Sequence, residues 1–137
     1  SSTLIYSPSS IEVEQWRTKF FAHLHEAYRR VMRNEIYYAL RCIDNLRLSM
    51  ITGWYMEVAI QPNTFGDWAK LEGQRSKLND HQLSLLALWH CNREQQDLFK
   101  VIRAIVPEFT KIHIKLCAQY EIEENTELVS EILNMVM

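Results

Sequence analysis

The side chains that could bind a ligand or assist a reaction gather in residues 41–72 of this 137-residue sequence. Asp44 lies three residues from Arg41 and three from Arg47, a spacing at which side chains pair on an α-helix. Two interpretations stay open for this trio. It is an ion-pair cluster at the surface or between helices, or it lines a polar pocket against another domain.

Aromatic and charged residues follow the trio along the chain. The aromatic ones are Trp54, Tyr55, Phe65 and Trp68, and the charged ones are Glu57, Asp67, Lys70 and Glu72. Aromatic faces beside carboxylates can hold a cationic, hydroxylated ligand by stacking and charge-assisted hydrogen bonds. The simpler alternative is that Trp54 and Trp68 belong to the hydrophobic core.

The motifs of an independent catalytic centre are missing from the sequence. His23 and Glu26 share a helix face but have no third metal ligand, and the chain has neither a Gly-rich phosphate loop nor a Gly-x-Ser-x-Gly turn. Cys42, Cys91 and Cys117 fit no metal-binding spacing and no disulfide framework, which favours a reducing cytosol. We therefore expect a cytoplasmic chain that is not catalytic by itself and holds no metal.

One spacing favours a different function. Arg75 and His81 show the Arg-x5-His pattern of small helical ribonucleases of the HEPN class. Arg17 and His23 have the same spacing at a place where it carries no such meaning, so chance matches to this pattern are expected in a chain with nine Arg and five His. A HEPN-like ribonuclease remains an alternative.

Three arginines, Arg29, Arg30 and Arg33, crowd the end of the first predicted helix. Positive charge there suits the helix dipole. The alternative is that the three side chains bind a phosphate group.

Hydrophobic periodicity predicts the elements that carry these residues. Ser9 and Glu12 have the spacing of a capping box and predict the start of a helix that runs to about Met32. Apolar residues also recur every three or four positions from Asn34 to Ile60, Val58 among them, which predicts a second long helix. Their short link favours antiparallel packing. Shorter helices are expected around Trp68 and after a cap formed by Asn79-Asp80 with Gln82, and the latter helix carries Leu83, Leu86, Leu88 and Trp89.

A further helix is expected from Glu94 to Tyr120, kinked or split by Pro107. The last one, from Thr126 to Val136, is expected to bury Leu128, Ile132, Leu133 and Val136. The sequence thus predicts an all-α bundle of five or six up-and-down helices in one domain, residues 11–137, after a linker of residues 1–10.

The composition of the chain limits the classes of binding partner that we expect. With only three Gly and three Pro, an all-β or Rossmann-like architecture is not expected. Because the net charge is −2, we expect no general attraction to nucleic acid or to an anionic membrane. No stretch approaches the roughly 18 apolar residues of a membrane span. The acidic excess near the end, at Glu121, Glu123, Glu124, Glu127 and Glu131, is typical of a solvated surface.

The order of these features resembles a known family. The pieces are FFAHLHEAYRRVMRNEIYYALRCIDNLRLSMITGWY, a loop with Asp67-Trp68-Ala69-Lys70, and FTKIHIKLCAQYEI. They look like the C-terminal helical domain of bacterial antibiotic nucleotidyltransferases, the kanamycin, streptomycin and lincosamide adenylyltransferases. The matching positions are Asn34-Glu35, Ala39-Leu40, the run from Ile43 to Arg47, and the helix from Phe109 to Ala118.

This resemblance implies a substrate-binding domain that closes the cleft over a separate catalytic domain and dimerises. The family's catalytic Gly-Ser turn and Asp-x-Asp pair are missing here, so Mg and NTP are expected only with an N-terminal catalytic domain or a separate catalytic chain. The resemblance implies substrate-binding roles for Asp44, Arg47, Arg41, Glu57, Trp54, Trp68 and Lys70. Asp44 and Glu57 would hold ammonium or hydroxyl groups, while the arginines would meet phosphate or fix those carboxylates. A non-catalytic helical dimerisation module is the rival interpretation.

Overall fold

The computed structural model describes residues 5–62 and 67–137, and the described residues form six helices and no strand. These are α1 (Ser10–Met32), α2 (Ile36–Glu57), α3 (Trp68–Glu72), α4 (Asp80–Leu88), α5 (Gln95–Gln119) and α6 (Thr126–Asn134). The all-helical prediction is confirmed. Within the described ranges, no helix has the length and apolar character needed to cross a bilayer.

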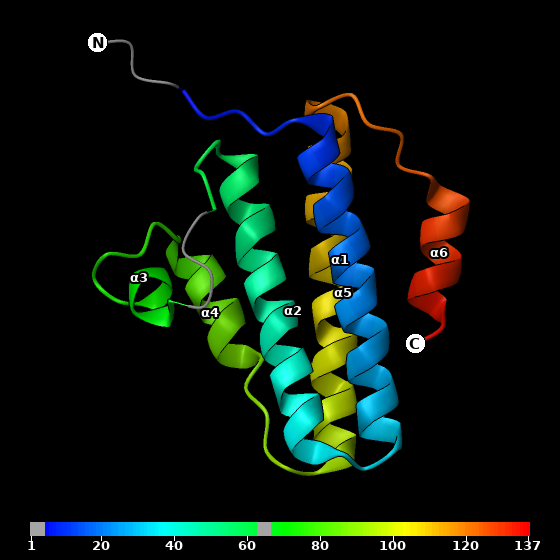
Figure 1. The fold of residues 1–137 in the computed structure, drawn as a ribbon. Helices are drawn as coiled ribbons and strands as arrows, with labels where there is room; N and C mark the ends of the chain where they lie inside the picture. The colour runs from blue at the N-terminus through cyan, green and yellow to red at the C-terminus, as the bar shows by residue number, and fades with distance from the viewer. Residues whose placement is uncertain (1–4, 63–66) are drawn as a thin grey trace.

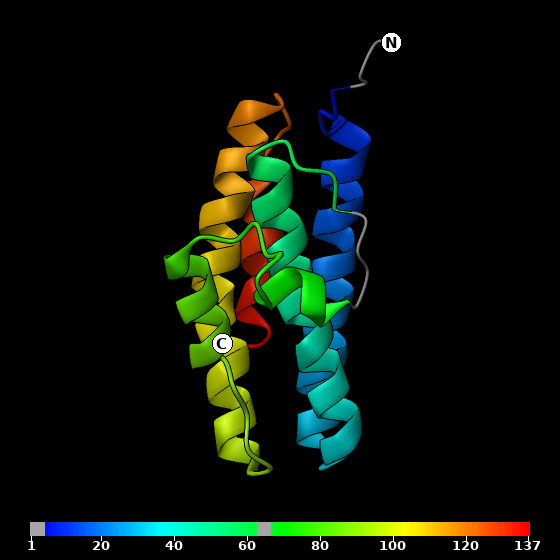
Figure 2. The same ribbon diagram turned by 90° about the vertical axis from the view of Figure 1, so that its left-hand side faces the viewer.

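Three long helices, α1, α2 and α5, pack against one another and form the centre of the molecule (Figure 1). Consecutive helices alternate in direction, apart from the short α3. The helices α3 and α4 lie beside α2, while α6 lies on the other side, next to α1 (Figures 1 and 2). Residues 67–94 lead the chain to the far end of the bundle, so α5 runs parallel to α2 (Figure 1).

The core consists of one buried stripe from each long helix. On α1 this stripe includes Phe20 and Leu24, which are fully buried at the three- to four-residue spacing of a helix face. The rings of Phe20 and Phe109 stack with centroids 3.9 Å apart, so α1 and α5 meet through aromatic contact. This packing confirms the main hydrophobic pattern of the sequence.

Glycine at position 53 allows α1, α2 and α5 to approach closely. A Cβ atom built on Gly53 would lie 2.7 Å from Cζ2 of Trp16 and 2.9 Å from Cγ2 of Ile112. Both distances are shorter than van der Waals contact allows. Gly53 therefore sits inside α2 as a packing residue and does not end the helix.

The three long helices end in the same way, and none of them uses glycine. Asn34, Ala59 and Glu121 follow α1, α2 and α5 with positive φ angles of 58°, 56° and 54°. In each case the next backbone N–H donates to a carbonyl five residues earlier, as Ile60 does to Tyr55 over 2.8 Å. This is the Schellman pattern of a helix C-terminus.

The predicted starts of α1 and α4 are confirmed, whereas α2 begins at Ile36 and not at Asn34. The Ser9 hydroxyl accepts a hydrogen bond from the Glu12 amide over 3.1 Å and caps α1. Asn79 and Gln82 form a reciprocal capping box at the start of α4. Both helix caps could therefore be predicted from residues that lie close together in the sequence.

Several predicted details are wrong. The predicted split at Pro107 does not occur, because α5 continues from Gln95 to Gln119 with the proline inside it, while the kink stays a prediction. The helix α2 ends at Glu57 and not at Ile60, because Ala59 adopts the left-handed backbone conformation. Three apolar residues expected inside the core are exposed instead: Val58, Leu88 and Leu128. Val129 is buried in place of Leu128, whereas Trp89, which the sequence analysis named together with Leu88, is buried.

Candidate functional site

The centre of the candidate site is Asp44, near the middle of α2. Its Oδ1 lies 3.3 Å from Nη2 of Arg47, and its Oδ2 accepts a hydrogen bond from the indole Nε1 of Trp68 over 3.3 Å. The predicted pairing of Asp44 with Arg47 is confirmed. The contact with Trp68 joins α2 to α3 across 24 residues of sequence.

Arg47 is fixed from a second direction. Its Nη1 donates a hydrogen bond of 2.6 Å to the backbone carbonyl of Trp89, which caps the end of α4. The Trp89 ring stacks on that of Trp54, with centroids 6.0 Å apart. Arg47, which orients the Asp44 carboxylate, is therefore itself held by Trp89, a member of a buried aromatic pair.

A groove of about 330 Å³ opens beside these residues, between α2, α3 and α4. We call it the Asp44 groove; its walls are Asp44, Arg47, Trp68, Glu72, Leu83, Leu86 and Ala87. Two carboxylates, one guanidinium and one indole thus face a space with an apolar wall from α4. That combination can hold an amine or hydroxyl group against an aromatic surface.

The other candidate residues lie elsewhere. Arg41 is exposed on α2 and Trp54 is buried in the core, so the simpler alternative holds for Trp54. Glu57 lies at the end of α2 and pairs with Lys115 over 3.3 Å. Lys70 lies 3.8 Å from Asp67 and outside the groove walls. Phe65 falls outside the described residues.

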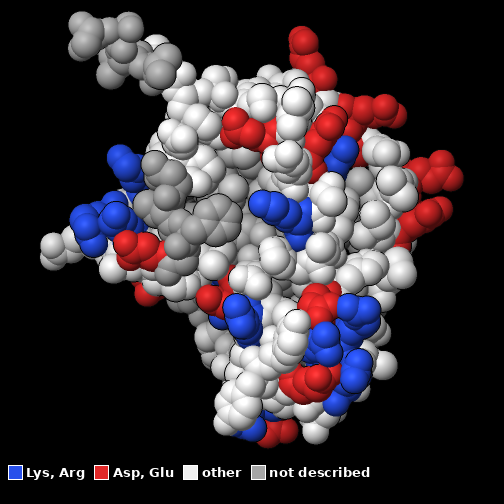
Figure 3. Space-filling model, viewed as in Figure 1, with Lys and Arg blue, Asp and Glu red and all other residues white. Residues whose placement is uncertain are grey.

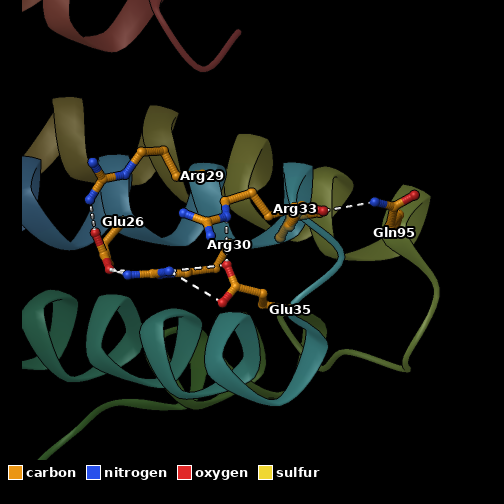
Figure 4. Close-up of polar contacts among 7 residues, drawn as sticks. Glu26, Arg29, Arg30, Arg33, Glu35 and Gln95 are labelled. Carbon is orange, nitrogen blue, oxygen red and sulfur yellow. Dashed lines mark hydrogen bonds and ion pairs between the residues drawn. The ribbon is translucent and has the colours of Figure 1, made fainter.

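The arginines at the end of α1 form an ion-pair network with two glutamates (Figure 4). Arg30 lies 2.7 Å from Glu26 and 3.0 Å from Glu35, and Arg33 also pairs with Glu35 over 3.0 Å. Hydrogen bonds from Arg29 and Arg30 lower the pKa of Glu26 to about 2. Basic and acidic side chains accordingly lie intermingled on this part of the surface (Figure 3).

Each of the three arginines pairs with one of the two glutamates, so the network joins α1 to α2 and keeps a net charge of only +1 for a phosphate group. The Arg30 guanidinium also lies 4.1 Å from the ring centre of Tyr38, which adds a cation–π contact. The phosphate interpretation gains no support from this arrangement.

Sequence reasoning missed a buried polar contact at the opposite end of the bundle. Nη1 of Arg17 lies 3.2 Å from Nε2 of His113 and donates to the Glu123 carbonyl over 3.0 Å. His113 is only 3% exposed, and burial, followed by the nearby Arg17 charge, lowers its pKa to about 4. Arg17 and His113 are 96 residues apart, so no local pattern could have joined them.

Arg17 therefore meets His113 and not His23, its partner in the Arg-x5-His spacing. Arg75 and His81 of the HEPN-like alternative are both exposed, in the turn after α3 and in the first turn of α4. Across residues 5–62 and 67–137, no three His, Cys, Asp or Glu side chains group closely enough to hold a metal ion.

Comparison of this chain with protein-family models, with curated proteins and with solved structures finds no match.

Proposed function

We propose that this chain is the substrate-binding, cleft-closing helical domain of a nucleotidyltransferase-like protein, and that its acceptor binds in the Asp44 groove. The observation that supports this most directly is the contact between the Trp68 indole and the Asp44 carboxylate at the groove wall. It places an aromatic surface and a negative charge together. Aminoglycosides, which carry several ammonium and hydroxyl groups, match that chemistry.

Asp44 keeps capacity for a ligand despite its two contacts. A carboxylate offers about four lone-pair positions, and the Asp44 side chain is 39% exposed. Trp68 and Arg47 fix its orientation, so less conformational entropy is lost when a ligand binds. Glu72 provides a second negative charge in the same groove.

The reaction itself belongs to another domain or chain in this proposal. That catalytic unit would hold Mg-NTP, and this chain would present the acceptor hydroxyl to it. The whole protein would transfer a nucleoside monophosphate to an antibiotic-like acceptor.

The test is calorimetric titration of this chain with kanamycin and with streptomycin. Removing the negative charge by Asp44→Asn should weaken binding by roughly 10–100-fold, because a charged hydrogen bond contributes about 1.5–3 kcal/mol. Glu108→Gln is the matched control, since Glu108 lies on α5 and pairs with Lys111. Equal affinity of Asp44→Asn and the unsubstituted chain would remove Asp44 from the site.

A non-catalytic helical interaction module is the second candidate, and the burial of Trp54, at 4% exposure, favours it over a ligand role for that residue. This candidate predicts that aminoglycosides leave the melting temperature unchanged. It also predicts a homodimer, which sedimentation equilibrium over a range of concentrations would detect. A monomer at all concentrations would contradict it.

A further inference from the structure

The helix α6 is attached to the bundle less extensively than the long helices are. It buries Val129 and Leu133, followed by Val136 just beyond its end, whereas α5 buries ten residues. These three side chains have the four- and three-residue spacing of one helix face. Figure 1 shows α6 beside α1, joined to α5 by an extended segment. Its position therefore depends on one short apolar stripe and a few polar contacts.

The polar contacts of α6 come from two different helices. Nε2 of His25 on α1 lies 3.5 Å from the carbonyl oxygen of Ile132, and Nε of Arg103 on α5 donates to the Val136 carbonyl over 3.2 Å. We call the surface of α1 and α5 around His25 and Arg103 the α6 docking surface. It holds an amphipathic helix by its apolar stripe and its backbone carbonyls.

The turn between α5 and α6, residues 120–125, carries backbone strain. Glu121 and Asn125 have positive φ angles of 54° and 53°. Asparagine tolerates this left-handed conformation, but it is unfavourable for glutamate because of the Cβ atom. The turn contains no glycine, which would adopt the conformation without that penalty. A short hinge under strain favours the exchange of a terminal element between two copies of a chain.

One side chain opposes the opening of this turn. Nη1 of Arg17 on α1 donates to the Glu123 carbonyl over 3.0 Å and lies 3.5 Å from the Glu124 carbonyl oxygen. Arg17 thus ties the turn to its own chain. The closed turn is therefore favoured by Arg17 and disfavoured by the left-handed Glu121.

The direction of α6 allows a closed exchange between two copies. Within one chain α6 runs antiparallel to α5 (Figure 1). When the turn opens, α6 continues away from the bundle along the direction of α5. Two copies that face each other with these ends place each α6 antiparallel to the α5 of the other copy, which is the native orientation. This arrangement has two-fold symmetry and leaves no docking surface empty.

We propose that two copies of this chain exchange α6 and form a homodimer in which the α6 of each copy occupies the docking surface of the other. Val129, Leu133 and Val136 regain their burial in the dimer, so the turn decides how readily it forms. The proposal does not depend on the acceptor site, because no wall residue of the Asp44 groove takes part.

The test uses the dimer expected when the concentrated chain is held in urea just below its unfolding midpoint and then returned to buffer. The sample contains equal amounts of ¹³C-labelled and unlabelled chains. Isotope-filtered NOE spectra should show contacts between His25 of one chain and Ile132 of the other. A dimer that forms through any other surface keeps this contact within one chain, and that result, or the absence of a dimer, would overturn the proposal.

Two substitutions should change the dissociation constant of the dimer in opposite directions. Glu121→Gly should raise it at least about tenfold relative to Glu121→Gln, because glycine removes the left-handed penalty in both copies while the two variants lose the same charge. Arg17→Met should lower it by about tenfold, since the closed turn loses a charged hydrogen bond. Sedimentation equilibrium measures both changes.

Two controls complete the experiment. Lys19→Met, also on α1, should leave the dissociation constant of the dimer unchanged. Asp44→Asn should exchange α6 as the unsubstituted chain does, which separates this result from that of the acceptor site. Equal dissociation constants for Glu121→Gly and Glu121→Gln would contradict the role of the strained turn and overturn the proposal.

Discussion

Arg47 on α2 donates a hydrogen bond of 2.6 Å to the backbone carbonyl of Trp89, at the end of α4. The same guanidinium faces Asp44 with its other nitrogen, 3.3 Å away. One side chain thus ties α4 to α2 and orients the carboxylate of the Asp44 groove. Since a helix C-terminus has unpaired carbonyls, this bond also satisfies an acceptor that the helix leaves open.

Replacing Arg47 by methionine should destabilise the fold as well as the groove. Arg47→Met removes a charged hydrogen bond to a buried backbone end, which costs about 1.5–3 kcal/mol. Urea unfolding measures the change. Arg41→Met, on the exposed face of the same helix, should stay within about 0.5 kcal/mol, and an equal loss in both variants would contradict the role of the Trp89 contact.

Gly53→Ala should destabilise the protein although alanine favours helices. Alanine adds about 1 kcal/mol of helix propensity, but its Cβ would lie 2.7 Å from a Trp16 ring atom that is held by Ser49. Overpacking in a core costs about 1–3 kcal/mol, so we expect a lower melting temperature. An unchanged or higher melting temperature would show that the Trp16 ring moves aside freely.

Stability should fall between pH 6.5 and pH 4 because of His113. Its pKa is about 4 in the folded chain and 6.5 in the unfolded chain, so the unfolded state takes up the proton first as the pH falls. The contribution is fully present above pH 6.5, and about 3 kcal/mol of it is lost by pH 4. Urea unfolding of His113→Gln at pH 7, 5.5 and 4 should show a shallower fall.

His90→Gln serves as the control for this pH series, since His90 is exposed. Its pH dependence should match that of the unsubstituted chain. Parallel curves for the His113→Gln variant and the unsubstituted chain would contradict the assignment to His113.

Arg17→Met should loosen the segment between α5 and α6. The Arg17 guanidinium holds the Glu123 carbonyl and lies against His113, so its loss leaves this segment without that anchor to α1. Hydrogen exchange followed by mass spectrometry should show faster exchange in residues 120–134 and unchanged exchange in the centre of α2. Lys19→Met, also on α1, should leave residues 120–134 as they were.

Ala59→Gly should stabilise the protein by about 0.5–1 kcal/mol, because the left-handed conformation at this position costs energy for any residue with a Cβ atom. Thermal unfolding would detect the increase. Ala22→Gly, in the exposed middle of α1, should have the opposite sign and cost about 0.5–1 kcal/mol. The same sign in both variants would contradict the argument.

The sequence predicted what is encoded locally. The buried stripe of α1, the Ser9 cap and the capping box at Asn79 all follow from residues within four positions of one another. The end of α2 was misjudged, because Ala59 gives no glycine signal for its left-handed conformation. The alternative that Pro107 splits its helix is wrong, since contacts with α1 and α2 keep α5 whole.

In the candidate site, too, contacts within one helix were predictable and contacts between distant segments were not. The pairing of Asp44 with Arg47 was predictable, because both lie on one helix. The contact of Trp68 with Asp44 and that of the Trp89 carbonyl with Arg47 depend on how residues 67–94 pack against α2, which hydrophobic periodicity does not predict.

The short link at residues 33–35 also bears on how the chain folds. It joins α1 and α2, whose mutual contact is the most extensive in the bundle. Contacts between neighbours in sequence form with little loop-closure entropy, so this hairpin can assemble early. The helix α5 must then arrive across the whole of residues 58–94, and α6 after it. We expect the folding transition state to contain the α1–α2 hairpin and to leave α6 unformed.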